Sequence, residues 1–303
     1  MKRLLTAVGI AALIAAGSAA WTLAAPGGSG GRTAGGTQAK LPPLPATVKS
    51  RGRWNIGVKC DVPPFGYVTA SGKHAGYDIE VAKAFARFAF GRGNRVSYVC
   101  VTTPSRIPTL MSKRVDIIIS TLTYTKARAE VIDYSAPYYG ATGRLLVPNN
   151  SSIKKLSDIS GKTIATTRGS IYDSWMHNCY KNTNVLLTDT TSASLLALRD
   201  RRASGFMYDD ALLVGVAAND SSTKLLGATF LAIPWGIGIR KGETDMRAWV
   251  NSRIKLMKQR DQFWRIMQHT IPRRFYGIFK KNVPRPTNTL RYPTGADPET
   301  ICR

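Results

Sequence analysis

Short apolar runs alternate with stretches of helical periodicity along most of this chain of 303 residues, and the alternation occurs in two sets. The strands and helices of the first set lie at 54–60, 77–90, 95–101, from Ser105 onward and at 115–119. Those of the second set lie at 162–166, after Ser170, and at 184–187, 193–199, 205–208 and 211–218. Strands that alternate with helices in this way predict an α/β fold with mostly parallel sheets.

Two extended stretches, at 140–147 and 229–240, separate the sets and are expected to link them. Two links between two α/β lobes mean that the second lobe is inserted in the first. We therefore expect lobe I to comprise residues 53–142 and 236–303, the latter with an extended C-terminal tail, and lobe II to comprise residues 143–235.

The N-terminus has the pattern of an export signal. Lys2 and Arg3 precede an apolar stretch at 4–16, and small residues follow. Residues 1–25 are therefore read as a signal peptide or as an uncleaved anchor, since a membrane-spanning helix needs roughly 20 apolar residues. The Gly- and Pro-rich segment 26–52 is read as a flexible tether. An exported chain is expected in the periplasm or on the outer face of the cytoplasmic membrane.

Export makes the four cysteines candidates for disulfides. Cys60 follows the first strand and Cys100 lies near the end of the second; neighbouring strands about 4.8 Å apart would bring this pair within reach. Cys179 and Cys302 would then be left for each other, although four cysteines allow three pairings. The three histidines lie far apart in the sequence and there is no C-x-x-C pair, so no metal and no cofactor is expected.

Three ordered segments carry the most informative spacing. They are Gly76–Ala84, Arg106–Leu110 with Val115–Arg128 and Ile132–Tyr139 after it, and Ile164–Ser170 with Phe206–Leu213 downstream. Together, over roughly residues 53–290, they resemble the extracellular solute-binding proteins of family 3, and among these the glutamate/aspartate binders. The resemblance implies a two-lobed, type II periplasmic-binding-protein fold and a monomeric, non-catalytic receptor of an ABC permease that closes on its amino-acid ligand by a hinge motion.

The resemblance and the strand ends together name the residues that hold the amino-acid backbone. Thr121 and Thr123 follow a strand at its carboxyl end, where open α/β sheets bind ligands. Arg128 is implied to hold the α-carboxylate, together with the helix start at Ser170. Without the resemblance, Arg128 could be a surface arginine paired with Glu130 or Asp133, and Ser170 a plain turn and N-cap. Asp209, also at a strand end, is implied to bind the α-ammonium; as bare chemistry it could instead cap a helix.

The resemblance to glutamate/aspartate binders implies that Arg106 selects the ligand side chain, with Lys59 as a second cation. Phe65 is expected to place its ring against the aliphatic part of the ligand. A core role for Phe65 is an open alternative. Some relatives carry a lysine where this chain has Val62, and others a histidine near Thr191. Because of these departures, the acidic preference rests mainly on Arg106, and glutamine and asparagine stay open as ligands.

The charge balance raises alternatives. There are 43 Lys and Arg against 18 Asp and Glu, a net charge of +25, which favours an anionic ligand, surface or polymer. An exported dehydratase on this fold would need a further carboxylic acid in the cleft to act as a general acid. Only Asp209 and Asp210 lie in suitable places. A cationic, envelope-associated sensor is the third alternative, because residues 251–281 hold nine basic side chains. We expect no enzyme activity and no nucleic-acid partner.

Overall fold

The computed structural model describes residues 41–302, so the expected signal or anchor segment (1–25) and residues 26–40 of the expected tether lie outside the described residues. Within the described range, no helix has both the length and the apolar character needed to cross a membrane.

Lobe I is built on a mixed sheet with the strand order β5-β1-β6-β14-β7. Its strands are β1 (Trp54–Val58), β5 (Val96–Cys100), β6 (Ile117–Ile119), β7 (Ile132–Tyr134) and β14 (Gly238–Arg240). β1 pairs in parallel with both β5 and β6, whereas β14 runs antiparallel to its neighbours. A small antiparallel sheet stands beside it, formed by β2 (Asp61–Val62), β3 (Gly66–Val68) and β4 (His74–Ala75).

Lobe II is built on a second mixed sheet with the order β10-β9-β11-β8-β12. Its strands are β8 (Tyr139–Pro148), β9 (Thr163–Thr167), β10 (Asn184–Thr188), β11 (Gly205–Asp209), β12 (Thr223–Leu225) and β13 (Phe230–Trp235). β9, β10 and β11 are parallel, and β8 pairs antiparallel with β11, β12 and β13.

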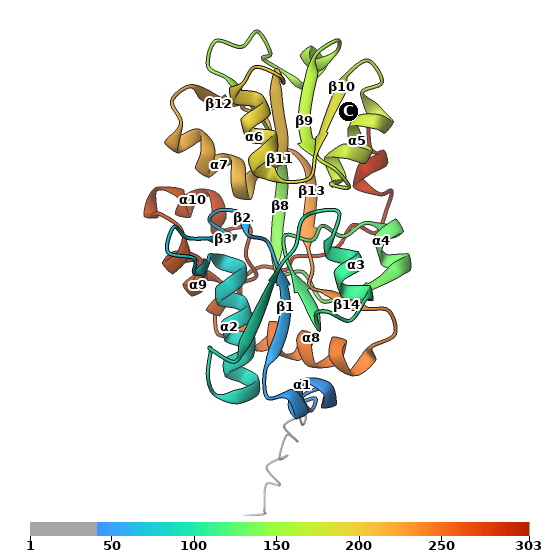
Figure 1. Cartoon of the computed structure of the whole chain (residues 1–303), viewed down its shortest axis with the longest axis vertical. Coiled ribbons are helices and arrows are strands. Elements are labelled where there is room, and N and C mark those ends of the chain that lie inside the picture. The colour runs from blue at the N-terminus through green and yellow to red at the C-terminus, as the bar shows by residue number, and fades with distance from the viewer. Residues whose placement is uncertain (1–40, 303) are drawn as a thin grey trace, which may run out of the picture. The chain divides into compact units, whose positions relative to one another are not determined.

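The two lobes are joined by β8 and β13, which pair with each other antiparallel and run side by side between the two sheets (Figure 1). Both lie in the stretches that the sequence marked as links. Two residues separate β13 from β14, so the chain returns directly to the sheet of lobe I. The predicted fold, two α/β lobes with the second inserted in the first, is thereby confirmed.

The helices follow the periodicity of the sequence. In α2 (Tyr77–Phe90), Val81 and Phe85 are buried, and Phe88 packs at the edge of the core. In α8 (Thr244–Gln259), Val250, Ile254 and Met257 are buried as expected. The other helices are α3 (Arg106–Met111), α4 (Lys126–Val131), α5 (Ile171–Cys179), α6 (Thr191–Arg199), α7 (Asp210–Asn219), α9 (Gln262–Thr270) and α10 (Tyr276–Phe279).

One helix lies where the sequence indicated a tether. α1 (Ala46–Arg51) begins after Pro45 and ends at Gly52, which adopts a left-handed conformation with φ of 69°. The side chain of Val48 is fully buried, and this contact explains why the segment is ordered. A six-residue segment with one buried apolar side chain gives too little periodicity to predict such a short helix.

The structure contains both expected disulfides, the one expected from neighbouring strands and the one between the two remaining cysteines. Cys60 is bonded to Cys100 next to the β1–β5 pairing, where Val58 lies opposite Cys100. Cys179, the last residue of α5, is bonded to Cys302. The first bond lies within lobe I, and the second ties the end of the chain to lobe II.

Phe65 lies at the centre of an aromatic cluster where the lobe I core meets the crossover strands. Its ring packs edge-on against Tyr77, Tyr139, Trp235 and Phe279, with ring centroids 4.8–6.0 Å apart. Its side chain is fully buried. Edge-to-face contacts of this kind add about 0.5–1.5 kcal/mol per pair to the effect of burial.

We predict that Phe65→Ala lowers the free energy of unfolding by about 3–5 kcal/mol, because it removes a buried ring and leaves a cavity. Denaturant unfolding followed by circular dichroism measures this. Met111→Ala, which truncates an exposed side chain of α3, is the control and should cost less than about 0.5 kcal/mol. A similar small loss for both variants would contradict the core role of Phe65.

Candidate functional site

Strand ends from both lobes line a small cavity. Its walls are formed by Thr103, Arg106, Thr121, Thr123, Ser170, Ile171, Tyr172, Tyr208 and Asp209. Residues 103–123 belong to lobe I, next to β6, and residues 170–209 belong to lobe II, at the ends of β9 and β11. The cavity therefore lies at the carboxyl ends of strands, where open α/β sheets bind ligands.

Of the eight residues expected to bind a ligand, the structure brings five together in these walls: Arg106, Thr121, Thr123, Ser170 and Asp209. Arg128 bonds to backbone atoms of Thr123 and Gly169, directly beside two of them. Lys59 and Phe65 do not line the cavity. Thr103, Ile171, Tyr172 and Tyr208 were not foreseen; the strand-end positions of Tyr208 and Thr103 were the signal that could have found two of them.

Thr121 holds an unusual backbone conformation at the lobe I wall. Its φ is +50°, in the left-handed region that a β-branched residue seldom adopts. The backbone N–H of Thr121 donates to Oδ2 of Asp78, which is fully buried in the first turn of α2, and the Tyr138 hydroxyl donates to the other oxygen of Asp78. Oγ1 of Thr121 is buried and has no hydrogen-bond partner among the described residues. This hydroxyl is thus held in place and remains available to a ligand.

Arg106 provides a buried positive charge. The residue begins α3, its side chain is 3% exposed, and Nη1 donates to the carbonyl oxygens of Ser120 (3.0 Å) and Thr121 (3.1 Å). Burial, followed by the nearby charge of Arg128, lowers the pKa of Arg106 to about 10, so the group stays protonated at neutral pH. Within residues 41–302 it forms no salt bridge.

Arg128 spans the boundary between the lobes. It lies in α4, where Nη1 donates to the carbonyl oxygen of Thr123 at 2.7 Å and Nη2 donates to that of Gly169, in lobe II, at 2.9 Å. The hydroxyl of Tyr134 donates to the same Thr123 oxygen at 3.0 Å. Like Arg106, Arg128 forms no salt bridge with any carboxylate that the structure describes.

The start of α5 differs in detail from the sequence expectation. The N–H of Gly169 donates to Oδ2 of Asp173 and that of Ser170 to the carbonyl of Thr167, so neither is free for an anion. The Ser170 hydroxyl caps the helix by accepting from the N–H of Asp173. The next two residues, Ile171 and Tyr172, both line the cavity. Because the first turn of a helix has unsatisfied N–H groups, these two are the donors left for an anion.

Asp209 and Asp210 have separate roles. Asp209 occupies the N-cap position of α7 without capping it, and its Oδ1 accepts a 2.7 Å hydrogen bond from the hydroxyl of Tyr172. Oδ atoms of Asp210 instead accept from Thr142 and from Nδ2 of Asn282, away from the cavity lining. Burial raises the pKa of Asp209 to about 7, and burial likewise raises the pKa of Asp210 to about 6.

Lys59 is neutralised within lobe I. Its side chain is fully buried, and Nζ lies 3.2 Å from Oδ1 of Asp61 and 3.4 Å from Oγ1 of Thr103. Asp61 also accepts from the N–H and the hydroxyl of Thr191, at the start of α6 in lobe II. The Lys59–Asp61 pair therefore adds no net charge to the site and contacts both lobes.

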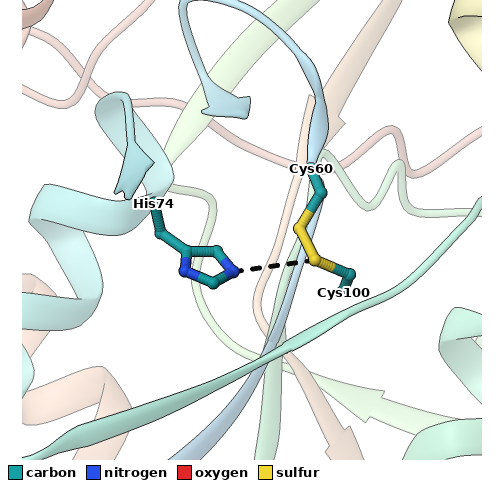
Figure 2. A group of neighbouring side chains, drawn as sticks. All are labelled: Cys60, His74 and Cys100. Carbon is teal, nitrogen blue, oxygen red and sulfur yellow. Dashed lines mark hydrogen bonds between the residues drawn. A yellow bond between two sulfur atoms is a disulfide. The ribbon is translucent and has the colours of Figure 1, made fainter. Parts of the chain in front are cut away.

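A histidine lies beside the first disulfide. Nε2 of His74 is 3.6 Å from Sγ of Cys100, and Figure 2 shows the ring directed at the Cys60–Cys100 bond. In the described part of the chain these are the three His, Cys, Asp or Glu side chains close enough to share a metal ion. Since both sulfurs are bonded to each other, neither is a thiolate ligand in this structure.

Residues 54–271 match the bacterial extracellular solute-binding proteins of family 3. The chain belongs to this family. Its relatives are solute receptors, and like them it is a binding protein and not an enzyme. A glutamine-binding protein of Geobacillus stearothermophilus is 34% identical over 196 residues, which are 64% of this chain and 75% of that protein. An L-glutamate/L-aspartate-binding protein of Pseudomonas aeruginosa is 28% identical, over 68% of this chain and 72% of the relative.

Solved structures of the family have the same fold. The crystal structure of the solute receptor for L-cysteine of Neisseria gonorrhoeae has a TM-score of 0.74 and 29% identity, and the match covers 77% of this chain and 95% of that one. Other family members are described as an ABC transporter glutamine-binding protein of Bacillus subtilis and an L-cystine-binding protein of Escherichia coli. The cavity described above thus lies in a protein family whose members bind different amino acids.

The raised pKa of Asp209 predicts a pH-dependent stability. An unfolded Asp has a pKa of about 3.9, so between about pH 4 and 7 the folded protein binds more protons than the unfolded chain. The free energy of unfolding should therefore fall as pH rises through this range, and Asp209→Asn should make the fall shallower. Denaturant titrations at several pH values, without ligand, measure both slopes. Asp200→Asn, at an exposed site, is the control; equal slopes in all three proteins would contradict this prediction.

Proposed function

We propose that this protein is the extracytoplasmic receptor of an ABC importer and binds an acidic amino acid, glutamate or aspartate, between its two lobes. The observation that carries the proposal is the pair of guanidinium groups, Arg106 and Arg128, that lack a carboxylate partner beside a cavity whose opposite wall holds Asp209.

The charges of the site match those of an acidic amino acid. Arg106 and Arg128 contribute two positive charges and ionised Asp209 one negative charge, while Lys59 and Asp61 cancel. Glutamate and aspartate carry two carboxylates and one ammonium group. A ligand of this class therefore pairs each charge. Pairing matters most for Arg106 and Asp209, which are buried, because buried charges are stable only when they are paired.

The ends of the ligand are assigned by which groups face each other. Arg128 and the N–H groups of Ile171 and Tyr172 form the anion-binding side for the α-carboxylate, because guanidinium groups and helix N-termini both favour carboxylates. Asp209 and the Thr121 hydroxyl receive the α-ammonium. Arg106 is then the group left for the distal carboxylate of the side chain.

Arg106 also decides between acidic and amide ligands. Glutamine would leave this buried guanidinium without an anion. A hydrogen bond to a charged group contributes about 1.5–3 kcal/mol, which is roughly a 10- to 100-fold preference for glutamate over glutamine. The family contains glutamine-binding as well as glutamate/aspartate-binding members, so the resemblance by itself does not choose.

Delivery and location follow the family. A relative is described as an ABC transporter protein, and we extend that partnership to this chain. The proposal includes export, guided by residues 1–25, and the division into lobe I (53–142 and 236–303) and lobe II (143–235). The net charge of +25 is compatible with contact with an anionic envelope surface, which the proposal does not require.

Arg106→Gln is the sharpest test of specificity, because it removes the charge and keeps a polar side chain with an amide donor. We expect glutamate and aspartate to bind about 10- to 100-fold more weakly and glutamine to bind no more weakly than before. Isothermal titration calorimetry with glutamate, aspartate, glutamine and asparagine measures both. Arg114→Gln, an exposed arginine, is the control. Equal losses for glutamate and glutamine would refute the role of Arg106.

Arg128→Ala tests recognition of the α-carboxylate, the group that all amino-acid ligands share. Because every amino acid has an α-carboxylate, we expect this change to remove binding of acidic and amide ligands alike, with the fold retained in circular dichroism. If the wild-type protein gives no heat with any of the four amino acids, the proposed ligand class is wrong. If Arg128→Ala weakens only the acidic ligands, Arg128 and Arg106 have been assigned to the wrong carboxylates.

A further inference from the structure

The C-terminal segment 282–302 contacts both lobes in turn. It follows α10 and contains no strand; its short 3-10 turn, Pro298–Thr300, lies against α5, as the red end of the chain shows (Figure 1). We call residues 282–302 the C-terminal strap. Its contacts fall into three groups, at the crossover, at lobe I and at lobe II.

The first group fixes the strap to the crossover. Asn282 is buried, and its carbonyl oxygen accepts from the N–H of Gly140 in β8 at 2.7 Å. Nδ2 of Asn282 donates to Oδ2 of Asp210 at 2.9 Å and to the hydroxyl of Tyr139 at 3.3 Å. The strap thus begins at the strand that joins the lobes.

The second group fixes the strap to lobe I, beside Arg128. The ring of Tyr292 stacks on Tyr124 with centroids 4.5 Å apart, and its hydroxyl donates to the carbonyl of Ser135 at 2.6 Å. Farther along, both carboxylate oxygens of Asp297 accept from the N–H of Lys126, each at 3.0 Å. Lys126 is the first residue of α4, the helix that carries Arg128.

The third group fixes the strap to α5 of lobe II. Nε1 of the buried Trp175 donates to the carbonyl of Ile301 at 2.8 Å, and Nδ2 of Asn178 donates to that of Glu299 at 3.0 Å. The disulfide between Cys179 and Cys302 makes this attachment covalent. α5 is the helix whose first turn lines the cavity.

We propose that the C-terminal strap is a third covalent connection between the lobes, which limits how far they open and slows release of the ligand. It joins α4 to α5, the two helices that flank the cavity from opposite lobes, so any hinge opening that separates these helices must extend or detach the strap. The effect on ligand release rests on the proposed function, in which the ligand lies between the lobes; the limit on opening does not.

The reach of the strap sets the size of this limit. From Asp297, held at lobe I, to Cys302, held at lobe II, there are five residues, which span at most about 17 Å when fully extended. Opening beyond that distance requires loss of the Asp297 contact, after which the next attachment to lobe I is Tyr292. Without the disulfide, only hydrogen bonds and packing hold the end of the strap to α5.

The test removes the covalent attachment in the Cys179→Ser/Cys302→Ser variant of the exported chain. We expect a larger radius of gyration for the ligand-free protein in small-angle X-ray scattering. We also expect L-glutamate to dissociate about tenfold faster in stopped-flow fluorescence, equivalent to about 1.4 kcal/mol lost from the closed state. The Cys60→Ser/Cys100→Ser variant is the matched control, because it removes a disulfide within lobe I and should leave the radius of gyration unchanged.

The outcomes separate this inference from the proposed function. Mass spectrometry verifies the serines in the Cys179→Ser/Cys302→Ser variant. If this variant has the same radius of gyration as the wild type, the proposed limit on opening is overturned. If L-glutamate does not bind to any form, the proposed ligand is wrong, and scattering still decides the role of the strap. Should the double variant fail to fold, Asp297→Ala keeps both disulfides and releases the strap from α4. Asp297→Ala should also increase the radius of gyration of the ligand-free protein. An unchanged radius of gyration would overturn the inference.

Discussion

A charge that is removed from water must find a partner, and this requirement governs the arrangement of the cavity between the lobes. Arg106 is satisfied in part by two backbone carbonyls and Arg128 by two others, yet neither has an anion. Asp209 has only a tyrosine hydroxyl, and burial shifts it toward the neutral form. These incomplete pairings are stable enough to fold because hydrogen bonds offset part of the desolvation cost. In the proposed function, a ligand with complementary charges would complete them.

Much of the fold could be predicted from the sequence because the apolar spacing is regular. Strands such as β1 and helices such as α8 follow that periodicity, and the two crossovers appear as extended stretches between the two sets of elements. The segments that could not be predicted have little periodicity. α1 depends on one buried valine. The strap contains four prolines and holds its place through contacts with residues more than a hundred positions away, such as Trp175.

The candidate site was predictable where position and residue type agree. Asp209 stands at a strand end and Arg106 at a helix start, and both line the cavity. Phe65 and Lys59 carry the right chemistry for a ligand contact, but the sequence does not reveal that one is enclosed by four rings and the other paired with Asp61. Thr103 and Tyr208 stand near strand ends, a position that could have indicated them, but threonine and tyrosine are common in strands, so their residue type alone does not mark a ligand contact.

Asp61 joins three groups at once, and this bears on the energetics of closure. Its carboxylate holds Lys59 inside lobe I and meets the first N–H of α6 from lobe II. In a hinge motion of the proposed receptor, water would replace Thr191 as the lobes separate, while Lys59 would keep Asp61 as its counter-ion. Closure would then remove water from an ion pair that is already formed, and it would place the Asp61 carboxylate at a helix N-terminus, where a negative charge is favourable. The lobes would meet at this point without leaving an unpaired lysine in the interior.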